Sequence, residues 1–345
     1  MNVKKQVLAK LDKAYAVSPI QINGYTHFLA ATEEHGKCLI FSPPHWKGSV
    51  IWDSPGGCMS LRPMPGRERA FVAIQEFFPI FKSEHAGIVY VEGNEVIAEP
   101  WHVIRVIDLP FVHRIEIVYV GSIPFIVAAS LCGGKAFQDD WSQPGVVYAG
   151  PIPKDPSVEW PLKPILEGVS KNHGMHATIM NKKQVVMISG KEGLFMLRVP
   201  EKSGSQWQYE QLLEHEVSDI YSYDIDGDSM PEIVTIEPFH GNGLVIYKYM
   251  FKSWRPIFET SIDFGHVVWA GEILGEITIL GGCRGGSKEL FFLRPKTSDL
   301  RTMSREILDS NVGPTQIVVV HKQDCDLIVS TNHRSNEVAL YELTM

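Results

Sequence analysis

The chain has 345 residues, 44% of them hydrophobic, and a formal net charge of −8 at pH 7. This length suits one large domain or two medium ones, and the acidic balance argues against a nucleic-acid partner because no basic stripe is available to meet phosphates. No apolar run is long enough to span a bilayer and the N-terminus has no apolar segment of signal-peptide length, so we expect a cytoplasmic protein without a membrane partner.

Seven short apolar segments of similar character recur along the chain and have the composition of strands. In chain order they are FLAAT (28–32), FVAIQ (71–75), FIVAAS (125–130), VVMIS (185–189), EIVTIE (232–237), ITILGG (277–282) and LIVST (327–331). Each is followed by a turn and another strand, and the pairs recur about every 50 residues, a period typical of propeller blades. The sequence therefore predicts an all-β fold in which residues 1–345 form a single seven-bladed β-propeller of four-stranded antiparallel blades.

The last blade lacks residues for its fourth strand, because the pair that ends at Met345 uses up the chain. An alternating segment, KQVLAK (5–10), is available at the other end. We predict that an N-terminal strand at about residues 3–12 completes this blade, which closes the ring and removes an exposed sheet edge.

Two long insertions, residues 77–86 and 131–145, lie between the second and third strands of their blades, so both should project from the same face. In the second insertion, Asp139, Asp140 and Trp141 offer a carboxylate pair and an aromatic surface for a sugar ring. A solvated surface turn is the alternative. In the first insertion Phe77, Phe78 and Phe81 are expected to roof the channel mouth or to face another subunit of a homo-oligomer.

The loops that enter the innermost strands should crowd around one mouth of the central channel. Counting back from each second strand gives Ala16, Met59, His113, His176, Asp219, His266 and Thr315 as the equivalent positions. Imidazoles and one carboxylate suit a borderline cation, so His113, His176, Asp219 and His266 are predicted to hold Zn²⁺, or else Mn²⁺ or Fe²⁺. His173 is an alternative to His176, and a polar channel that binds only water is the alternative for the whole ring.

The loops after the second strands open on the same face and add further polar side chains: His35, His85, His240, His333, Lys191, Arg284 and Arg334.

An acidic loop lies between the first two strands of the fifth blade, on the opposite face. Asp224, Asp226, Asp228 and Glu232 fall at its positions 1, 3, 5 and 9, the oxygen-rich spacing that Ca²⁺ or Mg²⁺ requires. An EF-hand is disfavoured because the flanks have no helical periodicity and Thr235 stands at position 12. We expect this cation to be structural.

The blade around the acidic loop resembles those of the FG-GAP (integrin-type) β-propeller family. The segments PFVHRIEI (110–117), HGMHATI (173–179), EPFHGNG (237–243) and DFGHVVWAGE (263–272), with KAFQDDWSQPGVVYAG (135–150), are similar to the propeller part of the aldos-2-ulose dehydratase family. This resemblance implies a metal-dependent lyase, by dehydration or β-elimination, or an isomerase, acting on a keto-sugar or sugar derivative with zinc in the propeller.

Under this reading the catalytic candidates are His240, His333, Asp140 and Arg284. The substrate-binding candidates are Trp141, Asp139, Lys191 and Phe78. A non-catalytic propeller that binds a carbohydrate or a protein is the alternative from another class. A polysaccharide lyase ranks lower, because an acidic chain supplies the electropositive groove needed for uronates only locally.

Overall fold

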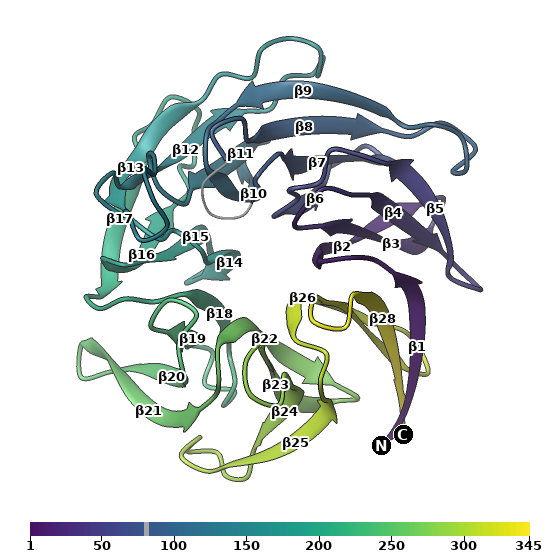
Figure 1. Cartoon of the computed structure of the whole chain (residues 1–345). Helices are drawn as coiled ribbons and strands as arrows, with labels where there is room; N and C mark the ends of the chain where they lie inside the picture. Colours follow the sequence, from purple (N-terminus) through teal and green to yellow (C-terminus); the bar gives the residue numbers. More distant parts are fainter. Residues whose placement is uncertain (79–82) are drawn as a thin grey trace.

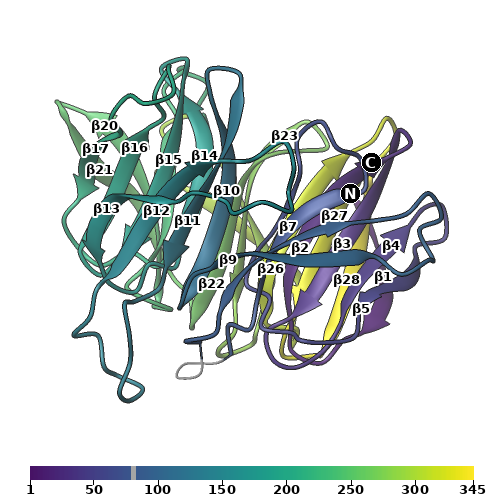
Figure 2. The same ribbon diagram turned by 90° about the horizontal axis from the view of Figure 1, so that it is seen from above.

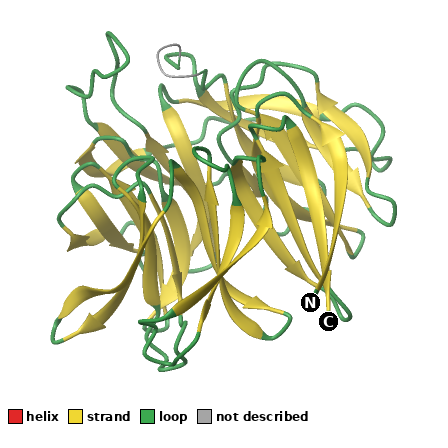
Figure 3. Cartoon of the chain, turned by 60° about the horizontal axis from the view of Figure 1, so that its bottom comes forward, coloured by secondary structure: helices red, strands yellow, loops and turns green. Residues whose placement is uncertain are grey.

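The computed structural model describes residues 1–78 and 83–345. Seven four-stranded antiparallel sheets are arranged like blades around a central axis (Figure 1). The described residues contain strands and loops but no helix (Figure 3). The predicted all-β, seven-bladed propeller is therefore confirmed.

Each blade runs from an inner strand at the channel to an outer strand at the rim. The inner strands are β2 (Ala14–Ile22), β6 (Leu61–Pro63), β10 (Val112–Val120), β14 (Met175–Met180), β18 (Asp219–Tyr223), β22 (Gly265–Ile273) and β26 (Pro314–His321). The second strands are β3 (Tyr25–Thr32), β7 (Ala70–Gln75), β11 (Ile123–Ser130), β15 (Lys183–Gly190), β19 (Glu232–Glu237), β23 (Glu276–Cys283) and β27 (Asp326–Asn332).

The third and fourth strands complete each sheet toward the rim. The third strands are β4 (Cys38–Ser42), β8 (Gly87–Glu92), β12 (Gly145–Pro151), β16 (Gly193–Arg198), β20 (Gly243–Met250), β24 (Leu290–Pro295) and β28 (Glu337–Thr344). The outer strands are β5 (Lys47–Trp52), β9 (His102–Asp108), β13 (Lys163–Val169), β17 (Gln208–Leu213), β21 (Ser253–Ser261), β25 (Met303–Asp309) and β1 (Asn2–Lys10).

The hydrophobic core lies between neighbouring blades, where the faces of the middle strands meet. All six residues of β7 are buried. Phe71 of this strand packs against Trp52 of the preceding blade, with ring centroids 6.2 Å apart. Because both faces of the middle strands are covered, their sequences are continuous apolar runs, which is why they carried the repeat signal.

The N-terminal strand closes the ring as predicted. β1 pairs antiparallel with β28, from Asn2 opposite Thr344 to Lys10 opposite Glu337. The two chain ends therefore lie side by side at the rim of one blade (Figures 1 and 2).

The 131–145 insertion follows β11, and the described residues of the 77–86 insertion follow β7. Both lie on the same face of the ring (Figures 2 and 3). Phe81, named above as part of an apolar cluster, lies outside the described residues. Over the part of the chain that the structure describes, no helix has the length and apolar character needed to cross a lipid bilayer.

Candidate functional site: a histidine cluster at the channel mouth

Several inner strands begin with the same backbone geometry, which aims one side chain into the channel mouth. Phe111 and Phe264 adopt left-handed φ angles of 58° and 55°. Two residues later each strand carries a β-bulge, at His113 in β10 and at His266 in β22. A bulge leaves one residue unpaired and redirects its side chain away from the regular alternation. The same arrangement recurs at two further residues, Tyr15 and Thr315.

Blade four differs because its inner strand pairs regularly with β15. Without a bulge, His176 lies along the channel wall, where its ring centroid is 4.1 Å from that of Tyr221. The left-handed residue that precedes the inner strand of this blade is Lys171, with a φ of 52°, and His173 follows two positions later. The structure thus places His173 at the mouth, the position for which the sequence count favours His176.

Three imidazoles converge at the mouth from blades four, five and six. One ring nitrogen from each of His173, His240 and His266 lies within 4.8 Å of the other two. The Nε2 atoms of His173 and His240 are 3.2 Å apart. This separation is close to the edge of a tetrahedron with metal–nitrogen bonds of about 2.0–2.1 Å, which is about 3.3 Å.

The third histidine is oriented by the backbone of blade seven. His266 Nδ1 lies 3.1 Å from the carbonyl oxygen of Thr315, to which it donates a hydrogen bond. A neutral imidazole with its proton on Nδ1 presents an unprotonated Nε2, and this atom is buried without a hydrogen-bond partner among the described residues. A backbone carbonyl that fixes the tautomer in this way is typical of metal-binding histidines.

Burial keeps these imidazoles neutral. It is the main cause that lowers the pKa of His173 and His266 well below the ordinary value of 6.5. Burial, followed by the charge of Arg284, lowers the pKa of His240 to about 3. The cluster therefore offers nitrogen lone pairs at neutral pH, which is the state that a metal ion binds.

Two of the histidines depend on a neighbouring glycine for their position. A Cβ atom on Gly174 would lie 2.3 Å from Ser189 Oγ, and one on Gly265 would lie 2.4 Å from Ile262 Cδ1. Only glycine lets the backbone next to His173 and His266 approach so closely.

These features fit a transition metal. Three neutral imidazoles form the donor set of one class of catalytic zinc site, and imidazole also suits Mn²⁺ and Fe²⁺. His173, His240 and His266 would hold such an ion.

Two other predicted ligands, His113 and Asp219, lie outside this trio. The ring centroid of His113 is 4.8 Å from that of His173, and its Nε2 lies 3.5 Å from the hydroxyl of Tyr15. Asp219 lines the channel wall beside His176, and burial raises its pKa to about 7.

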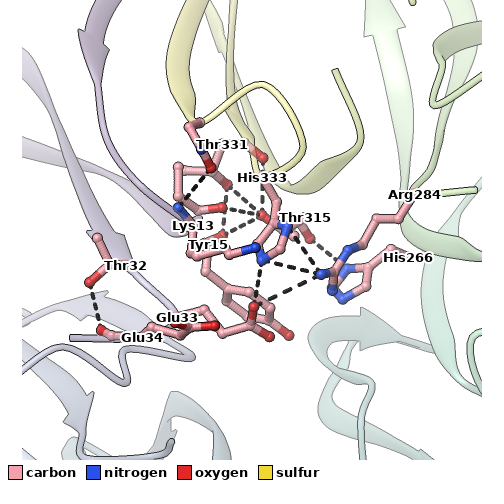
Figure 4. A network of polar contacts seen from close by, with 12 residues as sticks. Lys13, Tyr15, Thr32, Glu33, Glu34, His266, Arg284, Thr315, Thr331 and His333 are labelled. Carbon is pink, nitrogen blue, oxygen red and sulfur yellow. Dashed lines mark hydrogen bonds and ion pairs between the residues drawn. The ribbon is translucent and has the colours of Figure 1, made fainter. Parts of the chain in front are cut away.

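A second polar group adjoins the cluster and joins blades one, six and seven (Figure 4). His333 Nε2 lies 2.5 Å from Glu33 Oε2, and Arg284 Nη2 lies 3.1 Å from His333 Nδ1. Glu33 is absent from the sequence-based set. It directly follows β3 in the same loop as His35, and a search of these loops for carboxylates as well as imidazoles would have found it.

The predicted carboxylate pair, Asp139 and Asp140, stays within the 131–145 insertion. Asp140 accepts hydrogen bonds from the Ser142 hydroxyl at 2.6 Å and from the backbone of Ala136 at 3.0 Å. These hydrogen bonds lower the pKa of Asp140 to about 2. Asp139 is exposed. The structure therefore brings neither carboxylate into the histidine cluster.

Trp141 in this insertion is connected to the cluster through one aromatic ring. Its ring centroid is 5.7 Å from that of Phe239, which stacks on His240 at 4.1 Å. Phe78 instead packs on His35, with centroids 4.2 Å apart. Lys191 is exposed.

The acidic loop lies between β18 and β19, as predicted, and its carboxylates converge. Oxygens of Asp224, Asp226 and Glu232 lie within 4.8 Å of one another. The ammonium of Lys248, from β20, lies 2.5 Å from Asp226, 2.6 Å from Asp228 and 2.9 Å from Glu232. The carboxylate spacing fits Ca²⁺ or Mg²⁺, but a cation must compete with this ammonium for the same oxygens.

Comparisons with known proteins bear on the fold. No protein-family model and no curated protein sequence matches the chain. Among solved structures, the crystal structure of Saccharomyces cerevisiae Sqt1 is similar with a TM-score of 0.55 and 12% identity, over 92% of this chain and 81% of that chain. The likeness shows the fold alone. The FG-GAP blade type and the resemblance to aldos-2-ulose dehydratases stay predictions.

Proposed function

We propose that the channel mouth is the active site of a metal-dependent lyase or isomerase that acts on a keto-sugar or sugar derivative. The observation that carries this proposal is the convergence of His173, His240 and His266, together with a buried His266 Nε2 that has no hydrogen-bond partner in the described part of the chain. When bound, Zn²⁺, Mn²⁺ or Fe²⁺ would supply a Lewis acid for a carbonyl oxygen.

In this proposal Glu33 and His333 transfer the proton. His333 Nε2 lies 2.5 Å from Glu33 Oε2, and the guanidinium of Arg284 lies beside this pair. Such a pair can accept a proton from the carbon next to a carbonyl and return it to a departing hydroxyl, which leaves as water. His240, also considered as a base from the sequence, is assigned to the metal instead.

The test is elemental analysis of purified wild-type protein and of single alanine variants at His173, His240 and His266. We expect a transition metal in the wild type and at least about tenfold less in each variant. The matched control is His176→Ala, which removes an imidazole from the channel wall and should leave the metal content unchanged. A metal-free wild type, or metal loss only in the control, would refute the proposed centre.

Catalysis itself is tested by incubating the metal-loaded protein with candidate keto-sugars and following the ultraviolet absorbance of an enone product. Turnover that disappears in His266→Ala supports the proposal.

A non-catalytic propeller that binds a carbohydrate or a protein at this mouth is the second candidate. It is favoured by the aromatic surface of the 131–145 insertion, where Phe137 is 62% exposed and the Lys135 ammonium lies 3.3 Å from the centre of the Trp141 ring. Ligand binding that survives His266→Ala but not Trp141→Ala, without turnover of any keto-sugar, would favour this candidate.

A further inference from the structure

One arginine in the channel has no carboxylate partner among the described residues. Arg114, on β10, is 6% exposed, and its Nη1 donates to the backbone oxygens of Met59 at 2.9 Å and of His113 at 3.4 Å. No carboxylate of the described residues lies within 4 Å of its guanidinium. A buried, uncompensated charge costs several kcal/mol, so this arrangement calls for a counter-charge.

Two other arginines in this region have a carboxylate that compensates the charge of the guanidinium. Arg62, on the same channel wall, makes a two-pronged pair with Glu116, with nitrogen–oxygen distances of 2.8 and 2.6 Å. Arg284 at the mouth has Glu33 at 3.9 Å. Asp219 lines the channel with Arg114 but beyond salt-bridge distance, and because burial raises its pKa to about 7, it balances Arg114 only in part near neutral pH.

A cavity lies in front of this guanidinium. It has a volume of about 370 Å³ and is also lined by Ser18, Ser60 and Thr315. The carbonyl oxygen of Thr315 is the atom that orients His266, so the cavity adjoins the histidine cluster. Its volume falls within the range of pockets that hold small molecules, and the hydroxyl groups of Ser18 and Ser60 in its lining are suited to a sugar.

We propose that Arg114 binds the anionic group, a carboxylate or a phosphate, of a small molecule that occupies this cavity beneath the histidine cluster. This inference rests on the proposed function and deepens it: the substrate is an acidic sugar derivative, with its anion on Arg114 and its carbonyl toward the histidines. A guanidinium suits this role because its planar fork matches carboxylate and phosphate oxygens.

The test is isothermal titration calorimetry with three probes: gluconate, inorganic phosphate and neutral sorbitol. We expect the wild type to bind gluconate or phosphate but not sorbitol, and the stronger of the two anions identifies the group. Arg114→Gln should weaken that binding at least about tenfold. Arg198→Gln, which removes the same charge from a side chain that is 48% exposed in blade four, should leave it unchanged.

Thermal unfolding checks that each variant folds, and if Arg114→Gln does not, Arg114→Lys keeps the charge but loses the planar fork and should still weaken binding. Equal binding to wild type and Arg114 variants, or no anion binding by the wild type, overturns the inference and leaves Asp219 as the counter-charge. The titration is repeated on metal-free protein. Anion binding there without any metal in the wild type would refute the proposed metal centre while upholding the role of Arg114.

Discussion

Single residues at the channel mouth owe their positions to irregularities in the strands. A β-bulge at His113 and another at His266 shift the register, so the side chains that follow each bulge point to the opposite face of the sheet. His176, by contrast, lies in a strand that pairs regularly. Counting residues back from the second strands found the right region because the blades have similar lengths. It did not distinguish His173 from His176, because His173 lies in the loop before β14 and the count assumes the same loop length in every blade.

Glu33 gives the sharpest prediction at this scale. Glu33→Gln keeps the shape of the side chain but removes the carboxylate that pairs with His333, so proton transfer should fail while the metal trio stays intact. We expect kcat on a keto-sugar to fall by about 100-fold or more with the metal content unchanged. Steady-state kinetics and elemental analysis measure both, and an unaltered kcat would exclude this pair from the reaction.

At the scale of the blade, the acidic loop shows that a sequence motif can predict the carboxylates of a site without predicting the charges that surround them. Asp224, Asp226 and Asp228 lie in the turn between β18 and β19, and Glu232 is the first residue of β19. The sequence could predict this arrangement because the spacing of the four carboxylates is local. The ammonium of Lys248 comes from β20, and the sequence of the loop does not predict that it lies beside these carboxylates. The number of positive charges that meet these carboxylates therefore depends on strand pairing, not on the loop.

The competition between Lys248 and a divalent cation is testable. Lys248→Met removes the ammonium and leaves Asp226, Asp228 and Glu232 with no fixed positive charge, so their mutual repulsion must be relieved by an ion. We expect millimolar Ca²⁺ to raise the Tm of this variant by several degrees and that of the wild type by less. Differential scanning calorimetry with and without a chelator measures this. Equal calcium responses would show that the ammonium does not compete for the site.

On the scale of the whole molecule, the ring was predictable because its signal is repetitive. Each buried middle strand is an apolar run, and seven of them at a regular period leave few other folds. The same reasoning identified β1, since the last sheet otherwise lacks a strand. The contacts between blades that are not neighbours were not predictable, because no local pattern encodes them; for example, the guanidinium carbon of Arg114 in blade three lies 6.0 Å from the centre of the Tyr15 ring in blade one.

Ring closure should weaken in acid through Glu337 of β28. Burial alone would raise the pKa of this carboxyl, but hydrogen bonds from Lys5, Lys10 and Asn332 outweigh it and lower the pKa to about 2. A lowered folded-state pKa contributes stability that is present above the ordinary value near 4.5 and is lost as the pH falls toward 2.

We therefore expect the wild type to lose on the order of 1 kcal/mol more free energy of unfolding over that interval than Glu337→Gln, which cannot titrate. Urea unfolding at a series of pH values measures the difference. Parallel pH profiles for the two proteins would mean that Glu337 does not link the termini to acid sensitivity.

The pairing of β1 with β28 also determines when the ring can close during synthesis of the chain. β1 is synthesised before the other 27 strands that the structure describes and has no partner until β28 has emerged from the ribosome, so the ring stays open until then. Nascent chains that stall before β28 should therefore remain sensitive to proteases, and the pairing of β28 with β1 should confer resistance.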